Sequence, residues 1–329
     1  MLTFTGAQSL LQSMSGVPST DTTATTLLMQ YWNQSRQTVA GIKGGNWPWL
    51  EFEKTLDTVA DQDYLYVPND MRKVTAVRAV VGSGTSATIY LPVEVCDVKR
   101  WQLILAYRLG SNTYPYFAFQ QGQKMFFSPI PSVSTTDVIM TGKRKIYDLS
   151  IADYTTGTIV SIANAGTTVT GSGTTWTTGM AGQWIRITKT AAANGGDGEW
   201  YEVASVTSTT VLELVKPYQG TSIAAGSATY TMGQITYEPE TWQMAPIYRA
   251  LALYWGFKEN TVLSTSYWMS YDGGQEIGKR DEPGGMIGQM LYEAGETFDG
   301  NYIAPGDRLI TQLQQAPYYF PTQDASGFN

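Results

Sequence analysis

The 329-residue sequence contains no histidine and a single cysteine, Cys96. The absence of histidine excludes Ser-His-Asp and Cys-His catalytic sites and histidine-ligated metal centres. One cysteine can form neither an intrachain disulfide nor a cysteine metal cluster, and the apolar surroundings of Cys96 favour a small buried residue over a nucleophile. We therefore predict a protein that is not an enzyme, with no catalytic residues, no metal site and no cofactor.

Charged residues are scarce, at 15% of the chain, where about a quarter is usual. A surface with so few charges indicates that much of it is buried against other chains. The net charge of −7 provides no overall attraction for nucleic acid or for anionic membranes. The most apolar helical pattern, residues 245–257, is too short to span a bilayer and contains Arg249, so no membrane segment is expected.

Residues 273–280, GGQEIGKR, come within one residue of the phosphate-binding pattern G-x-x-x-x-G-K-[ST]. Arg280 occupies the position where a Ser or Thr hydroxyl would hold Mg²⁺, and a guanidinium has no acceptor for a metal. Pro283 also breaks the helix that should follow such a loop. The pattern therefore predicts a flexible charged loop without nucleotide hydrolysis. Its charged residues are Glu276, Lys279, Arg280, Asp281 and Glu282.

The first forty residues have the period of two amphipathic helices. Thr5 and Gln8 have the spacing of a capping box, and Gly16 can end the first helix. Asp21 can cap a second helix, in which apolar residues up to Val39 recur at helical spacing. We interpret this apolar stripe as core or helix-packing surface.

The next hundred residues or so change to the two-residue period of strands. Residues 63–70 predict a strand and a turn, residues 73–91 and 114–131 predict β-hairpins, and a further strand is expected over residues 138–147. Between the hairpins, a helix capped by Asp97 is expected to end at Gly110. Its side chains expected to face the core are Val98, Trp101, Leu105 and Leu109.

The composition shifts sharply over residues 155–236. Only seven of these 82 residues are charged, and Thr, Ser, Gly and Ala dominate. Short alternating runs separated by turn signals predict a small all-β sandwich or barrel of Ig-like type. Because helical periodicity resumes only afterwards, we predict an inserted β domain at 155–236 within a host domain of residues 1–154 and 237–304. The runs are GTIVSI, TTVTG, QWIRIT, EWYEVASV, TVLELV and ATYTM.

Helical patterns return after the β segment. Glu238 and Glu240 flank Pro239 at the start of the first, where acidic residues interact favourably with the helix dipole, and we prefer this to an acid/base pair. The expected fold class is α+β, a helical-bundle host with β-hairpins plus the inserted all-β domain. The helical segments are residues 237–257, 259–271 and 284–296.

Residues 305–329 form an extended tail without periodicity. Its prolines block helix formation, yet it contains three consecutive aromatic residues that are costly to leave in water. A segment of this kind typically becomes ordered on a partner, and the alternative is that it folds back on its own host domain. The aromatic triplet and its flanking prolines are Pro317, Tyr318, Tyr319, Phe320 and Pro321.

Five stretches outside the β segment occur in a particular order: NWPWLE, YLYVPNDMRKVTAV, VKRWQLI, YPYFAFQQGQKMFFSPIPS and PETWQMAPIYRALALYWG. This order resembles the head-to-tail connector, or adaptor, proteins of tailed bacteriophages. The similarity covers most of the predicted host, residues 1–154 and 237–300, and no single motif carries it. The β segment is similar to the β insertions common in phage structural proteins.

The resemblance implies a ring of about twelve copies beneath the portal, with a central channel for the genome. The implied partners are the portal protein and the tail nozzle, tube or fibre proteins. An acidic channel would repel phosphates, so DNA would pass without sequence-specific binding. The implied location is the head-tail interface of the virion, after assembly in the host cytoplasm.

The resemblance also implies roles for two segments. In the resembled adaptors a C-terminal extension reaches the portal, so we assign the aromatic triplet at 318–320 as a portal anchor. We place the charged loop at 276–282 near the channel or a subunit interface.

A carbohydrate-binding or receptor-contacting module, or a virion enzyme, is the alternative function for the β segment. Aromatic side chains could stack on sugar rings, although we favour core packing for them. Asp197 and Glu199 are the only carboxylates close enough for catalysis, and we favour a hairpin turn for them. The aromatic candidates are Trp176, Trp184, Trp200 and Tyr201.

Overall fold

The computed structural model describes residues 1–42, 47–81, 89–107, 110–134, 136–190, 195–224, 226–273 and 285–293. The chain divides into two compact units, residues 1–250 and 251–329. The predicted charged loop and the predicted C-terminal anchor both lie outside the described residues.

Two helices open the first unit, α1 (Phe4–Ser15) and α2 (Thr22–Gly41). The cap of α1 is Thr3, whose hydroxyl accepts from the N–H of Gly6, so the expected capping box at Thr5 is wrong by two residues. Gly16 ends α1 in the left-handed conformation, at φ 69°, as its position predicts. The cap of α2 at Asp21 is also confirmed.

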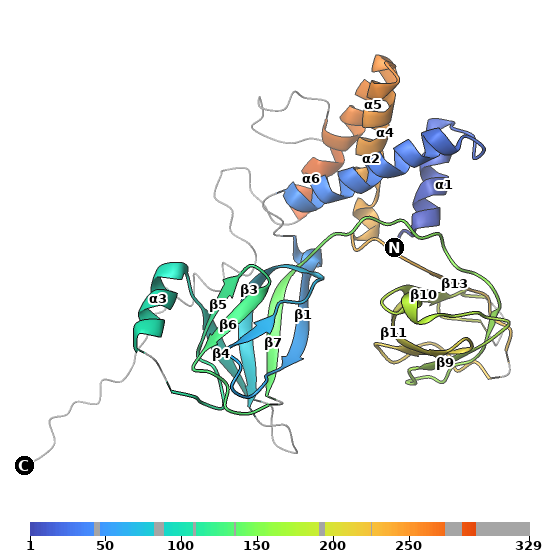
Figure 1. Cartoon of the computed structure of the whole chain (residues 1–329). Helices are drawn as coiled ribbons and strands as arrows, with labels where there is room; N and C mark the ends of the chain where they lie inside the picture. Colours follow the sequence, from blue (N-terminus) through green and yellow to red (C-terminus); the bar gives the residue numbers. More distant parts are fainter. Residues whose placement is uncertain are drawn as a thin grey trace, which may run out of the picture. The chain divides into compact units, whose positions relative to one another are not determined.

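A seven-stranded sheet is the largest element of the first unit (Figure 1). It consists of β1 (Glu51–Asp57), β2 (Tyr64–Tyr66), β3 (Met71–Val81), β4 (Ile89–Val95), β5 (Phe117–Gln121), β6 (Lys124–Ser128) and β7 (Asp137–Arg144). The strand order in space is β1-β7-β3-β4-β5-β6-β2. Its core includes Val77, Met125, Phe127, Val138 and Met140.

This sheet overturns the predicted helical-bundle host. The predicted hairpins exist as β3–β4 and β5–β6, but pairing of β7 with both β1 and β3 joins distant segments into one curled sheet. The six α-helices in the described ranges are mostly short. Local periodicity could not predict the seven-stranded sheet, because pairing between strands far apart in sequence leaves no local pattern. The strand β1 was not predicted, because most of its residues are polar and exposed and only Phe52 and Leu56 pack, half-buried, against the core.

The helix α3 (Val98–Tyr107) connects the parallel neighbours β4 and β5, which makes a β-α-β crossover. The carboxylate of Asp97 accepts from the N–H of Arg100 at 2.8 Å and caps the helix as predicted. The side chain of Trp101 is buried and stacks on Phe119, with ring centroids 5.7 Å apart.

The predicted core face of this helix is otherwise wrong. Val98 and Leu105 are 56% and 52% exposed. Leu109 lies outside the described residues. Trp101 is the only buried side chain of α3, and it provides the apolar contact with β5 through the ring of Phe119.

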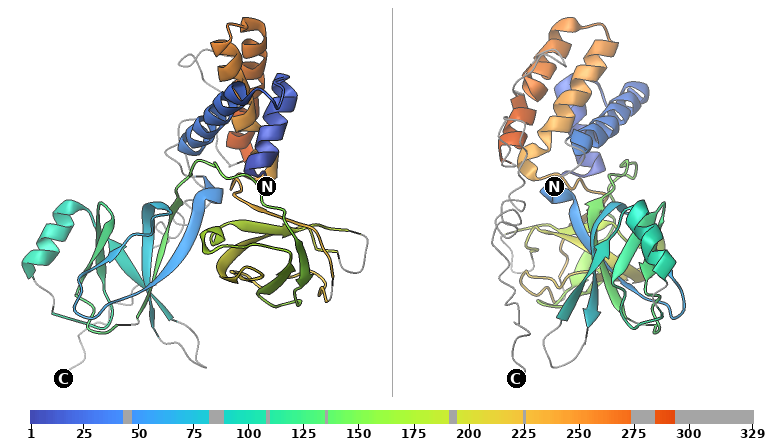
Figure 2. Two further views of the ribbon diagram at one scale, coloured as in Figure 1. Left: turned by 45° about the vertical axis from the view of Figure 1, so that its right-hand side comes forward. Right: turned by 90° about the vertical axis from the view of Figure 1, so that its left-hand side faces the viewer.

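All six alternating runs of the β segment are strands, which confirms their prediction. They are β8 (Thr158–Ser161), β9 (Thr168–Ser172), β10 (Trp184–Ile187), β11 (Trp200–Ser208), β12 (Val211–Leu214) and β13 (Tyr230–Gly233). They form one antiparallel sheet in the order β13-β10-β11-β12-β9-β8. Ile159 in the edge strand β8 pairs with Ala228, just before β13, so the sheet curls back toward its other edge. Of the two forms that the pattern allowed, a sandwich or a small barrel, the two-sheet Ig-like sandwich is wrong, because the segment forms a single curled sheet (Figure 2).

A hydrogen-bonded aromatic pair lies at the centre of this second sheet. The indole N–H of Trp176, which is 1% exposed, donates to the hydroxyl of Tyr230 at 2.9 Å. The hydroxyl of Tyr230 donates in turn to the carbonyl of Thr156 at 2.7 Å. The polar atoms of this pair are therefore satisfied inside the core, as buried polar groups require.

The remaining helices follow the second sheet, as predicted. The short helix η4 (Glu240–Trp242) precedes α4 (Met244–Phe257), which contains the boundary between the two units. In the second unit, α5 (Thr261–Asp272) packs against α6 (Gly285–Glu293). None of the helices in the described ranges has the length and apolar character that crossing a membrane requires.

We predict that Tyr230→Phe lowers the free energy of unfolding by about 1–3 kcal/mol, because it leaves the buried Trp176 N–H and the Thr156 carbonyl without partners. Urea denaturation of the full chain measures the change. Tyr66→Phe is the matched control, since Tyr66 is 60% exposed and its hydroxyl makes no hydrogen bond within the described part of the chain. Equal losses in the two variants would contradict the role of the buried hydrogen bonds.

Candidate interaction surface

A buried ion pair connects α2 to the segment that follows β13. Nε of Arg36 lies 3.3 Å from Oε1 of Glu238, and each side chain is 1% exposed. Arg36 also donates through Nη1 to the carbonyl of Tyr147 at 3.1 Å and lies over the ring of Trp32. Buried charges are tolerated only where they are paired and hydrogen-bonded, so this contact fixes three segments at one point.

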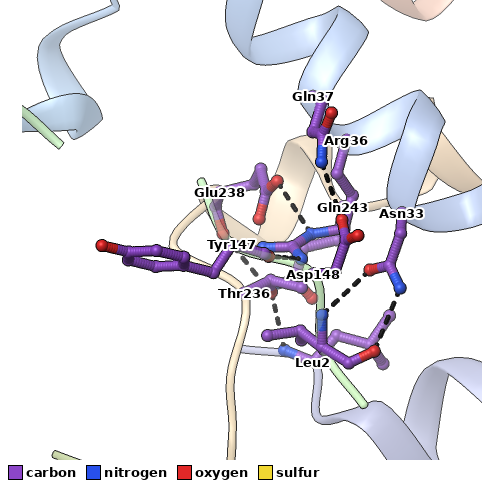
Figure 3. A network of polar contacts seen from close by, with 10 residues as sticks. Leu2, Asn33, Arg36, Gln37, Tyr147, Asp148, Thr236, Glu238 and Gln243 are labelled. Atoms are coloured by element: carbon purple, nitrogen blue, oxygen red, sulfur yellow. Dashed lines mark hydrogen bonds and ion pairs between the residues drawn. The ribbon is translucent and has the colours of Figure 1, made fainter. Parts of the chain in front are cut away.

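Two further side chains of α2 bind the segment that follows β7 (Figure 3). The amide of Asn33 donates to the carbonyl of Leu149 at 3.0 Å and accepts from the N–H of Leu149 at 3.1 Å. Gln37 donates to Oδ1 of Asp148 at 2.7 Å. Asn33, Arg36 and Gln37 share one face of the helix because they are spaced by three and four residues. This polar face holds the connections between the two sheets.

The N-terminal residues bind both connections. The N–H of Leu2 donates to the hydroxyl of Thr236 at 3.2 Å, and the N–H of Thr236 donates to the carbonyl of Leu2 at 2.9 Å. The hydroxyl of Thr3 donates to Oδ2 of Asp153 at 2.6 Å. Tyr154 and Met232 exchange two backbone hydrogen bonds of 2.7 and 2.9 Å. The chain entering the second sheet and the chain leaving it are therefore held side by side.

Sequence reasoning missed this ion pair. The expected helix start at Pro239 exists as η4, with Glu240 in its first turn, but the role expected of Glu238 is wrong, because Glu238 is buried in the ion pair with Arg36. A signal was present in α2, where Arg36 stands four residues after Trp32 and three before Val39, within the apolar stripe. A charge inside such a stripe indicates a buried partner, but local spacing cannot identify that partner.

The helix α3 presents apolar side chains that no other described element covers. Leu103, Leu105 and Tyr107 are 62%, 52% and 82% exposed. The apolar side of a helix is normally buried, yet here Trp101 is the only buried side chain of α3, which stands beside β5 (Figure 2). Clustered apolar exposure of this kind marks a surface for another polypeptide.

A groove of about 640 Å³ lies along α3. At its border, the guanidinium of Arg100 lies 2.7 Å from the carboxylate of Glu94 and 5.9 Å from the ring centroid of Phe117. An apolar lining with a charged border is the usual composition of a protein docking site. The other lining residues are Asp97, Lys99, Leu103, Ile104 and Tyr107.

The aromatic candidates for sugar binding have other contacts. Trp176 and Tyr201 are buried in the core of the second sheet, as core packing predicts. Trp184 and Trp200 are half-buried on the outer face. The ring of Trp184 meets Tyr237 edge-on at 6.4 Å, and the ring of Trp200 lies under the guanidinium of Arg186. These contacts give no support to a sugar-stacking platform.

The carboxylates considered for catalysis hold a turn. Asp197 accepts from the hydroxyl of Tyr201 and, at 3.0 Å, from the N–H of Glu199. Burial and the hydrogen bond to Asp197 raise the pKa of Tyr201 to about 12. Glu199 is exposed and makes no side-chain contact within the described residues. The two residues therefore have the geometry of a hairpin turn.

The remaining candidates for chemistry are also structural. Cys96 is buried, and desolvation with the nearby Glu94 charge raises the pKa of its thiol, which disfavours the reactive thiolate. In the part of the chain that the structure describes, no group of three or more His, Cys, Asp or Glu side chains is placed to hold a metal ion.

Comparison with known families finds a match to the family described as SU10 adaptor protein over residues 6–165. The matched region runs from α1 through the seven-stranded sheet to the first strand of the second sheet, β8. No curated protein matches the chain. The family match supports a phage adaptor, a structural protein of the virion that interacts with other virion proteins.

We predict that Glu238→Gln lowers the free energy of unfolding by about 3–5 kcal/mol, because it leaves the buried Arg36 charge without its partner. Denaturant unfolding of the full chain measures this loss. Glu53→Gln is the control, since Glu53 pairs with Arg78 at the exposed surface, where an ion pair contributes at most about 1 kcal/mol. A loss below about 1 kcal/mol in both variants would show that the buried pair does not hold α2 to the segment that follows β13.

Proposed function

We propose that the protein forms a ring of about twelve copies that joins the portal to the tail of a bacteriophage and lines the channel for the genome. The observation that carries this proposal is the uncovered apolar surface of α3 in a chain that matches a phage adaptor family. A closed ring of identical subunits buries two different flanks of each subunit. The groove along α3 supplies one such flank.

The proposed passage of DNA rests on charge. The chain carries 28 acidic and 21 basic residues, so a ring of these subunits has a strongly negative total charge. Negative walls repel the phosphate backbone, which allows DNA to slide without sequence-specific contacts. The charged loop at 276–282 is proposed to lie near this channel or at a subunit interface.

We assign residues 155–236 to an inserted domain that docks tail nozzle, tube or fibre proteins. The paired backbones of Tyr154 and Met232 support this assignment, because the two ends of an inserted domain must lie close together. The host domain is then residues 1–154 and 237–304. The tail at 305–329 anchors the ring to the portal through Tyr318, Tyr319 and Phe320.

Electron microscopy of the purified full-length protein, alone and mixed with portal rings, tests the proposal directly. The expected images show rings that stack on the portal. A protein that stays monomeric at high concentration, with and without portal, would remove the basis for a ring adaptor.

We predict that the double substitution Leu103→Glu and Tyr107→Ser abolishes ring formation with little change in melting temperature. Both side chains are exposed in the single chain, so their loss affects only contacts between chains. Mass photometry measures the assembly state. Val215→Glu is the control, because Val215 is an exposed apolar residue beside the second sheet. Normal rings from the double variant would show that α3 is not the subunit contact.

We also predict that truncation after Ala316 abolishes attachment to portal rings and leaves the melting temperature nearly unchanged. Replacing Tyr318, Tyr319 and Phe320 by serine in the full-length chain should have the same effect, since the anchor depends on these rings. Co-sedimentation with portal rings measures attachment. A truncated protein that melts markedly earlier and still binds the portal would show that the tail packs on its own host domain.

A further inference from the structure

A pocket of about 350 Å³ lies where the seven-stranded sheet, α2 and the second sheet meet, all within the first unit. Four of its lining side chains are cationic, and two are acidic, Asp70 and Glu202. One of the cations, Arg36, is already neutralised by Glu238. The other three cations are Lys54, Arg144 and Lys145.

The guanidinium of Arg144 is held between two aromatic rings. It lies 4.6 Å from the ring centroid of Phe52 and 4.2 Å from that of Tyr237. Stacking of this kind fixes the plane of the guanidinium and leaves its N–H edge available. Among the described residues, no carboxylate or carbonyl accepts a hydrogen bond from this side chain. The half-buried Arg144 therefore has an oriented fork of donors with no acceptor.

The two lysines of the pocket are likewise without a carboxylate partner in the described part of the chain. Lys145 lies over the ring of Tyr147, and Lys54 stands on the same strand as Phe52. Elsewhere in the first unit, Arg78, Arg100 and Lys143 each pair with a carboxylate. Other cations of the first unit, such as Lys124 and Arg186, lie over aromatic rings and also lack a carboxylate partner among the described residues, but only here do three such cations line one pocket that the structure describes.

We propose that this pocket binds a carboxylate side chain of another polypeptide. The planar fork of Arg144 matches the two oxygens of a carboxylate, and Lys54 and Lys145 add positive charge beside it. Trp184 and Tyr237 provide apolar walls for the rest of the bound segment. That this carboxylate belongs to another virion protein rests on the proposed adaptor role. That the pocket binds a carboxylate does not.

A nucleic-acid backbone fits the pocket less well. Recognition of a polyanion needs a continuous positive surface, and here Asp70 and Glu202 line the same pocket as the cations. The volume accommodates one side chain and its immediate neighbours, not a strand. A single carboxylate is therefore the favoured anion.

The test uses the purified full-length chain and calorimetric titration with a blocked tripeptide, acetyl-Gly-Asp-Gly-amide. The matched probe acetyl-Gly-Asn-Gly-amide has nearly the same shape and no charge. We expect the Asp peptide to bind and the Asn peptide not to bind. Arg144→Gln should weaken binding of the Asp peptide about tenfold or more, because a charge-assisted pair is lost.

Two further variants keep the test decisive. Arg186→Gln is the matched control, since Arg186 also lies over an aromatic ring, that of Trp200, but does not line the pocket. Its binding should equal that of the unaltered protein. Lys54→Gln changes an exposed side chain and should weaken binding severalfold even if Arg144→Gln fails to fold.

Equal binding of the Asp and Asn peptides, or equal loss in Arg144→Gln and Arg186→Gln, would overturn the proposal. Tighter binding of a single-stranded oligothymidine that is lost in Arg144→Gln would also overturn it, in favour of a nucleic-acid site. Because the measurement reads peptide binding and not assembly, its failure leaves the ring proposal intact, and the absence of rings does not affect it.

Discussion

The buried pair of Arg36 and Glu238 is the contact on which the arrangement of the first unit depends. Each sheet has its own apolar core, so apolar burial stabilises each sheet separately without orienting one against the other. The polar face of α2 supplies that orientation, because hydrogen bonds and ion pairs are directional while apolar contacts are not. The cost of burying two charges is offset by their mutual attraction and by the hydrogen bond from Arg36 to the carbonyl of Tyr147, and these contacts fix the segments around residues 147 and 238.

How much of this structure could be predicted depends on the distance between interacting residues in the sequence. The caps at Asp21 and Asp97 and all six strands of the second sheet could be predicted, because each follows from a few neighbouring residues. The seven-stranded sheet could not be predicted, because the pairing of β1 and β3 with β7 joins segments separated by 59 residues or more. The pairing of Arg36 with Glu238 could not be predicted either, because the two residues are far apart in the sequence.

The prediction of which α3 side chains face the core failed for a different reason. Its sequence has an apolar period, and the usual inference is that the apolar residues face the core of the same chain. That inference assumes that the core belongs to one chain. In α3 only Trp101 meets the assumption, while Leu103, Leu105 and Tyr107 remain outside. The scarcity of charge in the whole sequence and the uncovered helix point to the same property, a chain whose apolar residues exceed what its own fold buries.

The side-by-side connections of the second sheet also determine how it would respond to mechanical force. A pull on this sheet is divided between two backbones, and the cross-links between Tyr154 and Met232 make the two lengthen together. The contacts of Asn33, Arg36 and Gln37 join these connections to α2, so part of any load on the sheet passes to that helix through side chains instead of through the backbone alone.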